Sequence, residues 1–166
     1  MKILIIGGVA AGTKTAAKLK REDRSAEVTV ITKDRDISYA GCGLPYYVGG
    51  LIENREELIV NTPAKYAGLT GVEVKTGKEA IALCADKKEV IVKDVETGAE
   101  EAYGYDKLVL TVGASPAKLP IEGTDLSGVF QMRTPDDAEN IRSYVEENQV
   151  KKAVVIGAGF IGLEVA

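Results

Sequence analysis

The feature that most constrains this chain is a pattern found at both of its ends, in which a short apolar run leads into a glycine-rich loop. Residues 2–6 lead into Gly7-Gly8-Val9-Ala10-Ala11-Gly12, and residues 153–156 lead into Gly157-Ala158-Gly159-Phe160-Ile161-Gly162. Short apolar runs are typical of parallel strands that are buried on both faces. Glycines at this spacing allow a tight turn between a strand and a helix that pack closely. The chain is therefore predicted to be an α/β protein with a Rossmann-like, three-layer fold.

The residues between the two loops extend this prediction. Residues 12–24 have helical periodicity and residues 28–31 are strand-like, which completes a βαβ unit with the first strand. Further β-like segments, separated by turn sequences, follow at residues 72–74, 79–83, 89–92 and 107–110. They predict an inserted antiparallel meander at about 72–105, ahead of a core strand at 107–112. A helix is expected over residues 136–148.

The composition excludes several classes of function. The 166 residues carry a net charge of −4, which argues against general binding to nucleic acids or membrane surfaces. No apolar run approaches the ~20 residues of a membrane helix, and the start is unlike a secretory signal, so a cytoplasmic location is expected. The chain contains no histidine. That absence excludes a Ser-His or Cys-His pair within it, and no metal site is expected.

The second loop has the complete dinucleotide pattern, with glycines at positions 157, 159 and 162 between an apolar run and a helical sequence. Such glycines bring the positive end of the helix to a pyrophosphate. A turn that serves packing alone is the alternative. The acidic residue that separates NADH from NADPH binding is expected about 20 positions further on, beyond Ala166.

The first loop departs from the pattern because Val9 replaces the second glycine. Its position after a strand and before a helix still fits a nucleotide. About 20 residues beyond Gly12, where an acidic side chain normally binds the ribose, the chain has Thr32 followed by Lys33. A threonine hydroxyl replaces a carboxylate only in part, so the ribose contact is expected to be weaker.

Cys42 is the more informative of the two cysteines. It lies between Gly41 and Gly43 in a turn-rich segment, where main chain or a cofactor ring can approach closely. A helix that begins near Cys42 would favour the reactive thiolate form. A buried, inert role is the alternative, but the Gly-Cys-Gly setting and the two nucleotide-type loops favour redox chemistry. Cys84 lies within an apolar strand and is expected to be a core residue.

Two segments resemble a known family. Residues 37–47 (Ile-Ser-Tyr-Ala-Gly-Cys-Gly-Leu-Pro-Tyr-Tyr) and 105–114 are similar to the single-cysteine branch of the pyridine nucleotide-disulfide oxidoreductases. This branch includes coenzyme A-disulfide reductases, NADH oxidases and NADH peroxidases. The resemblance implies an FAD-dependent enzyme that uses NADH or NADPH, with Cys42 as catalytic residue and a homodimer as the full-length form. It also implies a domain order: residues 1–115 as the N-terminal part of the FAD-binding domain, 116–134 as a linker, and 135–166 as the incomplete start of the NAD(P)-binding domain.

The motifs and the resemblance together assign residues to each ligand. FAD is expected to contact Gly7, Gly8, Val9, Ala10, Ala11, Gly12, Thr32, Lys33, Cys42, Ala80, Thr111, Val112, Gly113 and Arg133. NAD(P) is expected to contact Ile156, Gly157, Ala158, Gly159, Phe160, Ile161 and Gly162. The resemblance also implies that coenzyme A lies along the first helix, and it assigns substrate binding to Lys14, Lys18 and Arg21 on one helical face, together with Ser38. The three cations suit the phosphates of coenzyme A. A solvated charged face is the alternative for these cations.

Within the family, Cys-Gly-Leu-Pro-Tyr-Tyr is most similar to the reductases of coenzyme A disulfide and coenzyme A persulfide. The peroxidases have a histidine at the position of Ala10, which argues against peroxide reduction here. Gly41 stands where the reductases usually have asparagine, so the substrate stays open. The implied function is reduction of coenzyme A disulfide or persulfide through Cys42. The alternatives are reduction of oxygen at the flavin with a Cys42 sulfenic acid, and a non-catalytic nucleotide-binding fragment.

Overall fold

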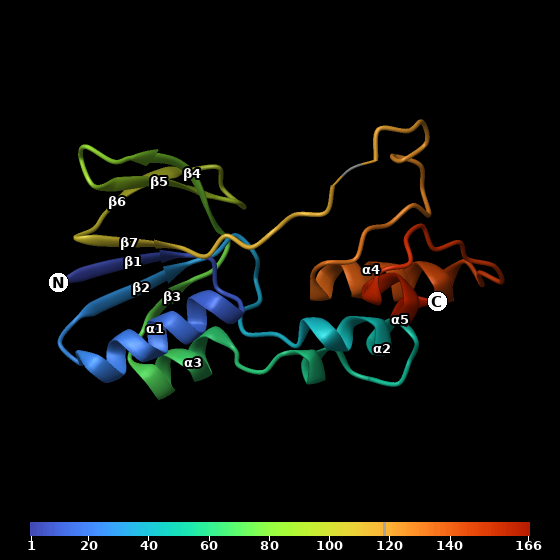
Figure 1. Ribbon diagram of the computed structural model, residues 1–166, viewed down its shortest axis with the longest axis horizontal. Helices are drawn as coiled ribbons and strands as arrows, with labels where there is room; N and C mark the ends of the chain where they lie inside the picture. The colour runs from blue at the N-terminus through green and yellow to red at the C-terminus, as the bar shows by residue number, and fades with distance from the viewer. Residues whose placement is uncertain (118) are drawn as a thin grey trace. The chain divides into compact units, whose positions relative to one another are not determined.

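The chain forms two compact units in a computed structural model that describes residues 1–117 and 119–166 (Figure 1). The first, here called the sheet unit, comprises residues 1–39 and 60–113. The second, here called the helical unit, comprises residues 40–59 and 114–166. Lys118, in the expected linker, lies outside the described residues.

A four-stranded parallel sheet is the centre of the sheet unit, with strand order β3-β2-β1-β7. The strands are β1 (Lys2–Ile6), β2 (Glu27–Ile31), β3 (Glu73–Lys75) and β7 (Lys107–Leu110). Alternate residues of β1 point to opposite faces of the sheet and join two different core clusters, Ile3 and Ile5 in one and Leu4 and Ile6 in the other. Burial on both faces explains why the β1 sequence is uniformly apolar.

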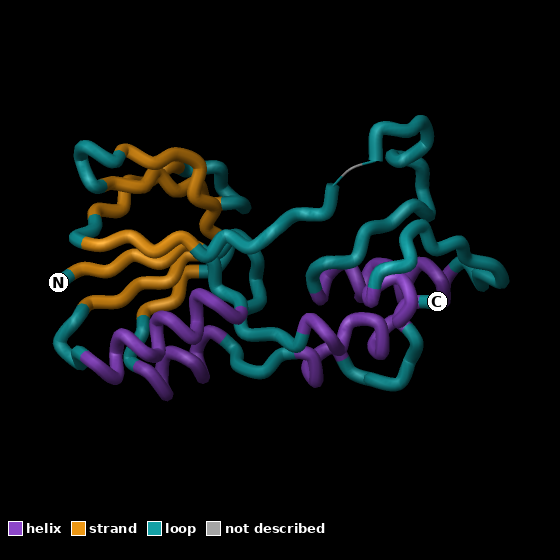
Figure 2. The backbone as a smooth tube through the Cα atoms, viewed as in Figure 1, coloured by secondary structure: helices purple, strands orange, loops and turns teal. Residues whose placement is uncertain are grey.

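Two helices cover one face of this sheet: α1 (Ala10–Glu22) and α3 (Pro63–Thr70) (Figure 2). Ala16 of α1 and Tyr66 of α3 are buried in the cluster that contains Ile3 and Ile5. The α3 helix begins where the Thr62 side chain accepts a hydrogen bond from the Lys65 amide, and it ends at Gly71 with a left-handed φ of +70°.

A three-stranded antiparallel meander packs on the other face of the sheet (Figure 2). Its strands are β4 (Lys78–Cys84), β5 (Glu89–Asp94) and β6 (Glu100–Gly104). Val90 and Val92 of the central strand are buried in the cluster that contains Leu4 and Ile6. The predicted three-layer α/β fold with an inserted meander is therefore confirmed.

The boundaries of the meander differ from the prediction at both ends. The segment expected to begin the meander, residues 72–74, overlaps β3 (Glu73–Lys75), which belongs to the parallel sheet because it pairs in parallel with β2 from Thr29↔Glu73 onward. Strand β6, which the sequence pattern did not reveal, completes the meander by pairing with β5. Local strand propensity predicts an extended segment but does not identify its partner.

The helical unit contains the 3-10 turns η1 (Gly41–Gly43) and η2 (Arg55–Leu58) and the helices α2 (Leu44–Val48), α4 (Pro135–Glu147) and α5 (Phe160–Val165). Its core consists of Leu44, Tyr47, Leu58 and Ala138. The helix α4, expected over 136–148, begins with a capping box in which Thr134 and Asp137 bond each other's main-chain amides.

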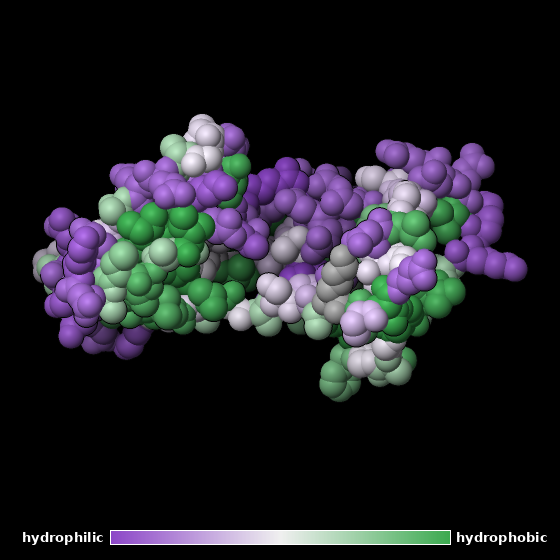
Figure 3. Space-filling model, turned by 90° about the horizontal axis from the view of Figure 1, so that it is seen from above, coloured by the Kyte–Doolittle hydropathy of each residue, from purple (hydrophilic) through white to green (hydrophobic). Residues whose placement is uncertain are grey.

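The expected strand at residues 153–156 does not form. Within the described residues no strand pairs with this segment, and Val154 and Ile156 are 88% and 75% exposed. A strand requires a hydrogen-bonded neighbour, so an apolar sequence alone is not sufficient. Apolar side chains stand at the surface of both units among polar ones (Figure 3). None of the described helices has the length and apolar character needed to cross a membrane.

Candidate functional site

The first glycine loop, residues 7–12, connects β1 to α1 and is tightly enclosed. Gly7 has a φ of +107°, and a Cβ added there would lie 2.1 Å from the Thr111 carbonyl oxygen. A Cβ on Gly12 would lie 1.8 Å from the Gly7 carbonyl oxygen. The Thr111 hydroxyl, at the end of β7, donates hydrogen bonds to the carbonyls of Ile6 and Gly7 at 2.8 and 3.1 Å. Only glycine fits the first and last positions of this loop.

The first turn of α1 leaves its main-chain amides without a side-chain cap, because Val9 occupies the N-cap position. Uncapped amides and the positive end of the helix dipole attract a phosphate group. The turn is held from behind by Tyr66 of α3, whose hydroxyl donates a hydrogen bond to the Thr13 carbonyl. Burial raises the pKa of Tyr66. The predicted contact residues Val9, Ala10 and Ala11 thus lie on a fixed helix N-terminus.

Thr32 follows the last residue of β2 and lies beside Gly8. A Cβ on Gly8 would meet the Thr32 methyl group at 3.0 Å and the Ile37 Cγ2 at 2.9 Å. Thr32 is 6% exposed, whereas the neighbouring Lys33 is exposed. The structure therefore places the predicted ribose-contacting residue next to the loop.

The other predicted contacts of the sheet unit lie further along the chain. Val112 is exposed and Gly113 has a left-handed φ of +67°. Ala80 of β4 packs beside the cluster of Leu4 and Ile6. Ser38, predicted to contact substrate, has a φ of +50° and its amide donates a hydrogen bond to the Gly8 carbonyl at 3.2 Å.

The second glycine loop, residues 157–162, repeats the geometry of the first. Gly157 has a φ of +117°, and a Cβ on Gly162 would lie 2.0 Å from the Gly157 carbonyl oxygen. Gly159 is the N-cap residue of α5, again without a side-chain cap. Phe160 and Ile161, both predicted to contact NAD(P), are 89% and 59% exposed.

Cys42 is exposed and occupies the middle of η1, directly before α2. The expected helix near Cys42 is therefore present. No atom lies within 4 Å of the position that a Cβ on Gly41 would take, whereas a Cβ on Gly43 would meet Leu58 at 3.0 Å and Ile52 at 3.2 Å. The turn that contains Cys42 is therefore open on the side of Gly41 and packed against Ile52 and Leu58 on the side of Gly43.

Two predicted residues have surroundings that need separate description: Cys84 is less buried than expected, and Arg133, predicted to contact FAD, belongs to the helical unit and not to the sheet unit. Cys84, expected in the core, is only half-buried, because β4 is an edge strand of the meander. Arg133 lies in the helical unit, where its Nε donates to the Ala114 carbonyl at 3.1 Å and its amide to the Asp137 carboxylate at 2.9 Å. Among the described residues no group of three or more Cys, Asp or Glu side chains is placed to hold a metal ion.

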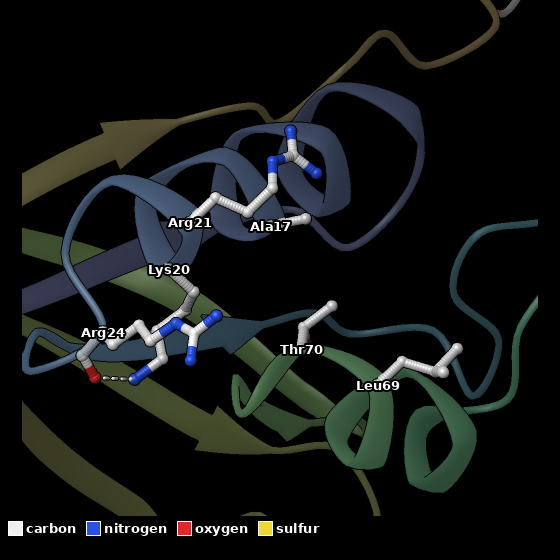
Figure 4. Close-up of a pocket in the computed structure, with 6 residues that line it drawn as sticks. All are labelled: Ala17, Lys20, Arg21, Arg24, Leu69 and Thr70. Atoms are coloured by element: carbon white, nitrogen blue, oxygen red, sulfur yellow. Dashed lines mark hydrogen bonds between the residues drawn. The ribbon is translucent and has the colours of Figure 1, made fainter.

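The three cations assigned to substrate binding on α1 have different surroundings. Lys14 is exposed, and Lys18 forms an i,i+4 ion pair with Glu22 at 2.5 Å. Arg21 lines a groove of about 730 Å³ between α1 and α3 (Figure 4). The other residues that line this groove are Ala17, Lys20, Arg24, Leu69 and Thr70.

Lys20 and Arg24 were not predicted as groove residues. The Lys20 ammonium donates a hydrogen bond to the Arg24 carbonyl at 2.8 Å (Figure 4). It donates a second one to the Ala26 carbonyl at 2.9 Å, so Lys20 binds the main chain that follows α1. Basic residues at the last turn of a helix are common for dipole reasons alone. Their convergence with Leu69 depends on the packing of α3, which no local pattern reveals.

Comparisons with known proteins match this arrangement along the whole chain. A model of the family described as pyridine nucleotide-disulphide oxidoreductase matches residues 1–166. An NADH oxidase from Methanocaldococcus jannaschii is 41% identical, with 100% of this chain aligned to 37% of that protein. A coenzyme A disulfide reductase from Staphylococcus haemolyticus is 37% identical, with 99% aligned to 37%.

A solved structure of an NAD-dependent persulfide reductase from A. fulgidus superposes with a TM-score of 0.93 at 40% identity, covering 99% of this chain and 31% of that chain. The chain thus spans about 37% of the length of the curated relatives that it matches.

Proposed function

The chain belongs to the pyridine nucleotide-disulphide oxidoreductase family, and from this membership we propose that it is part of an FAD-dependent NAD(P)H:disulfide oxidoreductase. Its substrate is a coenzyme A disulfide or persulfide, and Cys42 is the redox-active residue. Residues 1–115 belong to the FAD-binding domain, 116–134 form a linker, and 135–166 begin the NAD(P)-binding domain. We expect the full-length protein to be a cytoplasmic homodimer.

The first glycine loop fits the pyrophosphate of FAD. Its crowded glycines bring the uncapped first turn of α1 to the end of β1, where phosphate oxygens can accept hydrogen bonds from main-chain amides. Thr32 beside Gly8 supplies a hydroxyl for the ribose. When bound, FAD supplies two-electron transfer between a nicotinamide and a sulfur atom. The second loop, with the uncapped start of α5, would hold the NAD(P)H pyrophosphate in the same way.

The observation that carries the proposal is the setting of Cys42, an exposed cysteine in η1, directly before α2 and beside the open position of Gly41. The Cys42 thiolate attacks one sulfur of the substrate disulfide, so that a mixed disulfide forms, the substrate S–S bond breaks and one thiolate leaves. Two electrons from NAD(P)H then cleave the mixed disulfide and restore the Cys42 thiolate. In sum, NAD(P)H, one proton and one disulfide give NAD(P)⁺ and two thiols.

The groove between α1 and α3 supports a substrate that carries phosphate groups. Three basic side chains, Lys20, Arg21 and Arg24, line it together with the apolar Leu69. Guanidinium groups bind phosphate with paired, charge-assisted hydrogen bonds. Coenzyme A combines phosphates with an adenine ring, which suits this mixture of cations and apolar surface.

The experiment that tests the proposal is anaerobic turnover of the full-length protein with NAD(P)H and coenzyme A disulfide. Thiol release is expected in the wild type and in Cys84→Ser, which removes the other cysteine of residues 1–166. Cys42→Ser is expected to lose turnover, together with the long-wavelength charge-transfer band that the Cys42 thiolate gives beside oxidised flavin once NAD(P)H has reduced the protein by two electrons. Retention of the disulfide reductase activity by Cys42→Ser would contradict the proposal.

Reduction of oxygen is the second candidate, favoured by the similarity to a NADH oxidase. In that case Cys42 would cycle through a sulfenic acid, and NAD(P)H consumption would require oxygen and ignore coenzyme A disulfide. Flavin absorbance of the purified 166-residue chain tests the third possibility. A colourless protein would indicate that this part of the enzyme does not bind FAD alone.

A further inference from the structure

The Cys42 turn, defined as residues 40–43, contacts two neighbouring segments of the helical unit, one that contains Ile52 and one that contains Leu58. Gly43 packs so closely on Ile52 and Leu58 that a methyl group at its Cα would lie 3.2 and 3.0 Å from their side chains. In addition, the Ala40 amide donates to the Leu58 carbonyl at 2.7 Å. The position of the turn therefore depends on where Ile52 and Leu58 are held.

The segment that contains Ile52 is fastened to α4 by Arg142. One nitrogen of its guanidinium, Nη1, lies 3.3, 3.2 and 3.0 Å from the carbonyl oxygens of Tyr47, Ile52 and Glu53. The guanidinium also stacks over the Tyr47 ring at 4.8 Å. Three carbonyl dipoles that converge on one cation leave their segment little freedom to shift without it.

The segment that contains Leu58 is fastened to the same helix by Arg55. This residue begins η2, and its side chain is only 15% exposed. It donates to two carboxylates of α4, from Nε to Glu139 at 2.9 Å and from Nη2 to Asp136. Each of the two segments that contact the Cys42 turn is thus bound to α4 by its own arginine.

We propose that Arg142 and Arg55 are positioning residues for Cys42, which act by holding Ile52 and Leu58 against Gly43. This inference rests on the proposed redox role of Cys42. The apolar core of Leu44, Tyr47, Leu58 and Ala138 already holds the helical unit together. Apolar contacts are not directional, so they do not fix the position of the Cys42 turn by themselves. The arginines add directional hydrogen bonds, which fix that position.

The test compares Arg142→Gln, Arg55→Gln and Arg142→Lys in the full-length, flavin-containing protein. Lys151→Gln is the matched control, since it removes one positive charge from an exposed position in the same unit. For both glutamine variants, kcat is expected to fall by about tenfold or more, because displacement of a reacting group by about 1 Å has effects of this size. The KM for coenzyme A disulfide is expected to stay unchanged, because Arg142 and Arg55 do not line the α1–α3 groove.

Two further readouts separate positioning from folding. In Arg142→Gln, the long-wavelength thiolate–flavin band is expected to weaken. The flavin occupancy and the melting temperature of the flavin-bound protein are expected to equal those of the wild type. Arg142→Lys keeps a cation that can donate to the same carbonyls, so it is expected to restore most of the band and of kcat.

Glutamine variants with wild-type kcat and band intensity would overturn the inference, and so would an effect of Lys151→Gln of equal size. The inference would also be overturned if the loss of kcat were fully explained by loss of flavin or by a lowered melting temperature. These outcomes differ from failure of the proposed function, in which the wild type and Cys42→Ser would have the same activity and the same spectrum.

Discussion

In both glycine loops the first glycine has a strongly positive φ, +107° at Gly7 and +117° at Gly157. The last glycine of each approaches the carbonyl of the first so closely that a Cβ would lie 1.8 or 2.0 Å from it. Their surroundings differ. The first loop lies among the ends of β1, β2 and β7, whereas the apolar residues that flank the second are exposed. The glycine pattern therefore encodes the turn itself, and neighbouring strands decide how firmly the turn is held.

The largest effect is expected from Gly7→Ala in the first loop. The new methyl group would lie 2.1 Å from the Thr111 carbonyl oxygen, and the φ of +107° is unfavourable for alanine. The overlap involves main-chain atoms, so the free energy of unfolding is expected to fall by about 3 kcal/mol. Urea unfolding of the 166-residue chain measures this change.

Gly68→Ala is the matched control for Gly7→Ala. Gly68 lies on the exposed side of α3, with nothing within 4 Å of the added Cβ. Alanine in a helix interior is favoured over glycine, so this variant is expected to gain about 0.5–1 kcal/mol. If Gly7→Ala were as stable as Gly68→Ala, the enclosed geometry of the first loop would be wrong.

How far the sequence predicts this molecule depends on how local each feature is. The apolar run of β1, the helix α1 and the setting of Cys42 follow from patterns within a few residues, and all three were predicted. The parallel pairing of β3, the half-buried position of Cys84 and the contact of Gly43 with Ile52 were not. Each of these depends on which segment arrives from elsewhere in the chain, and residue propensities do not contain that information.

The intermediate effect is expected from Thr32→Val, which tests whether the first loop binds a ribose through a hydroxyl. Valine has nearly the same shape as threonine, so the contact with Gly8 is retained while one hydrogen-bonding group is lost. Loss of one such bond corresponds to about 1 kcal/mol, or about a fivefold weaker Kd for FAD. Flavin titration of the apoprotein provides the measurement.

Thr97→Val serves as the control for this variant, because Thr97 lies in an exposed turn between β5 and β6. Its FAD affinity is expected to equal that of the wild type. Equal affinities for Thr32→Val and Thr97→Val would show that Thr32 only packs against Gly8, and the first loop would then lack the ribose contact assigned to it.

The smallest effect on stability is expected from Gly162→Ala, although its added Cβ overlaps a carbonyl oxygen almost as severely as at Gly12. Ile156 and Phe160 beside this loop are exposed, so the turn can open without disturbing a packed core. The free energy of unfolding of the 166-residue chain should therefore change by only about 0.5 kcal/mol. In the full-length protein the same variant is expected to raise the KM for NAD(P)H at unchanged flavin content, because it displaces the amides at the start of α5.

Gly159→Ala is the control for stability, since nothing lies within 4 Å of its added Cβ. A loss of stability as large as that of Gly7→Ala would mean that the second loop is held as firmly as the first, and the contrast between them would then disappear.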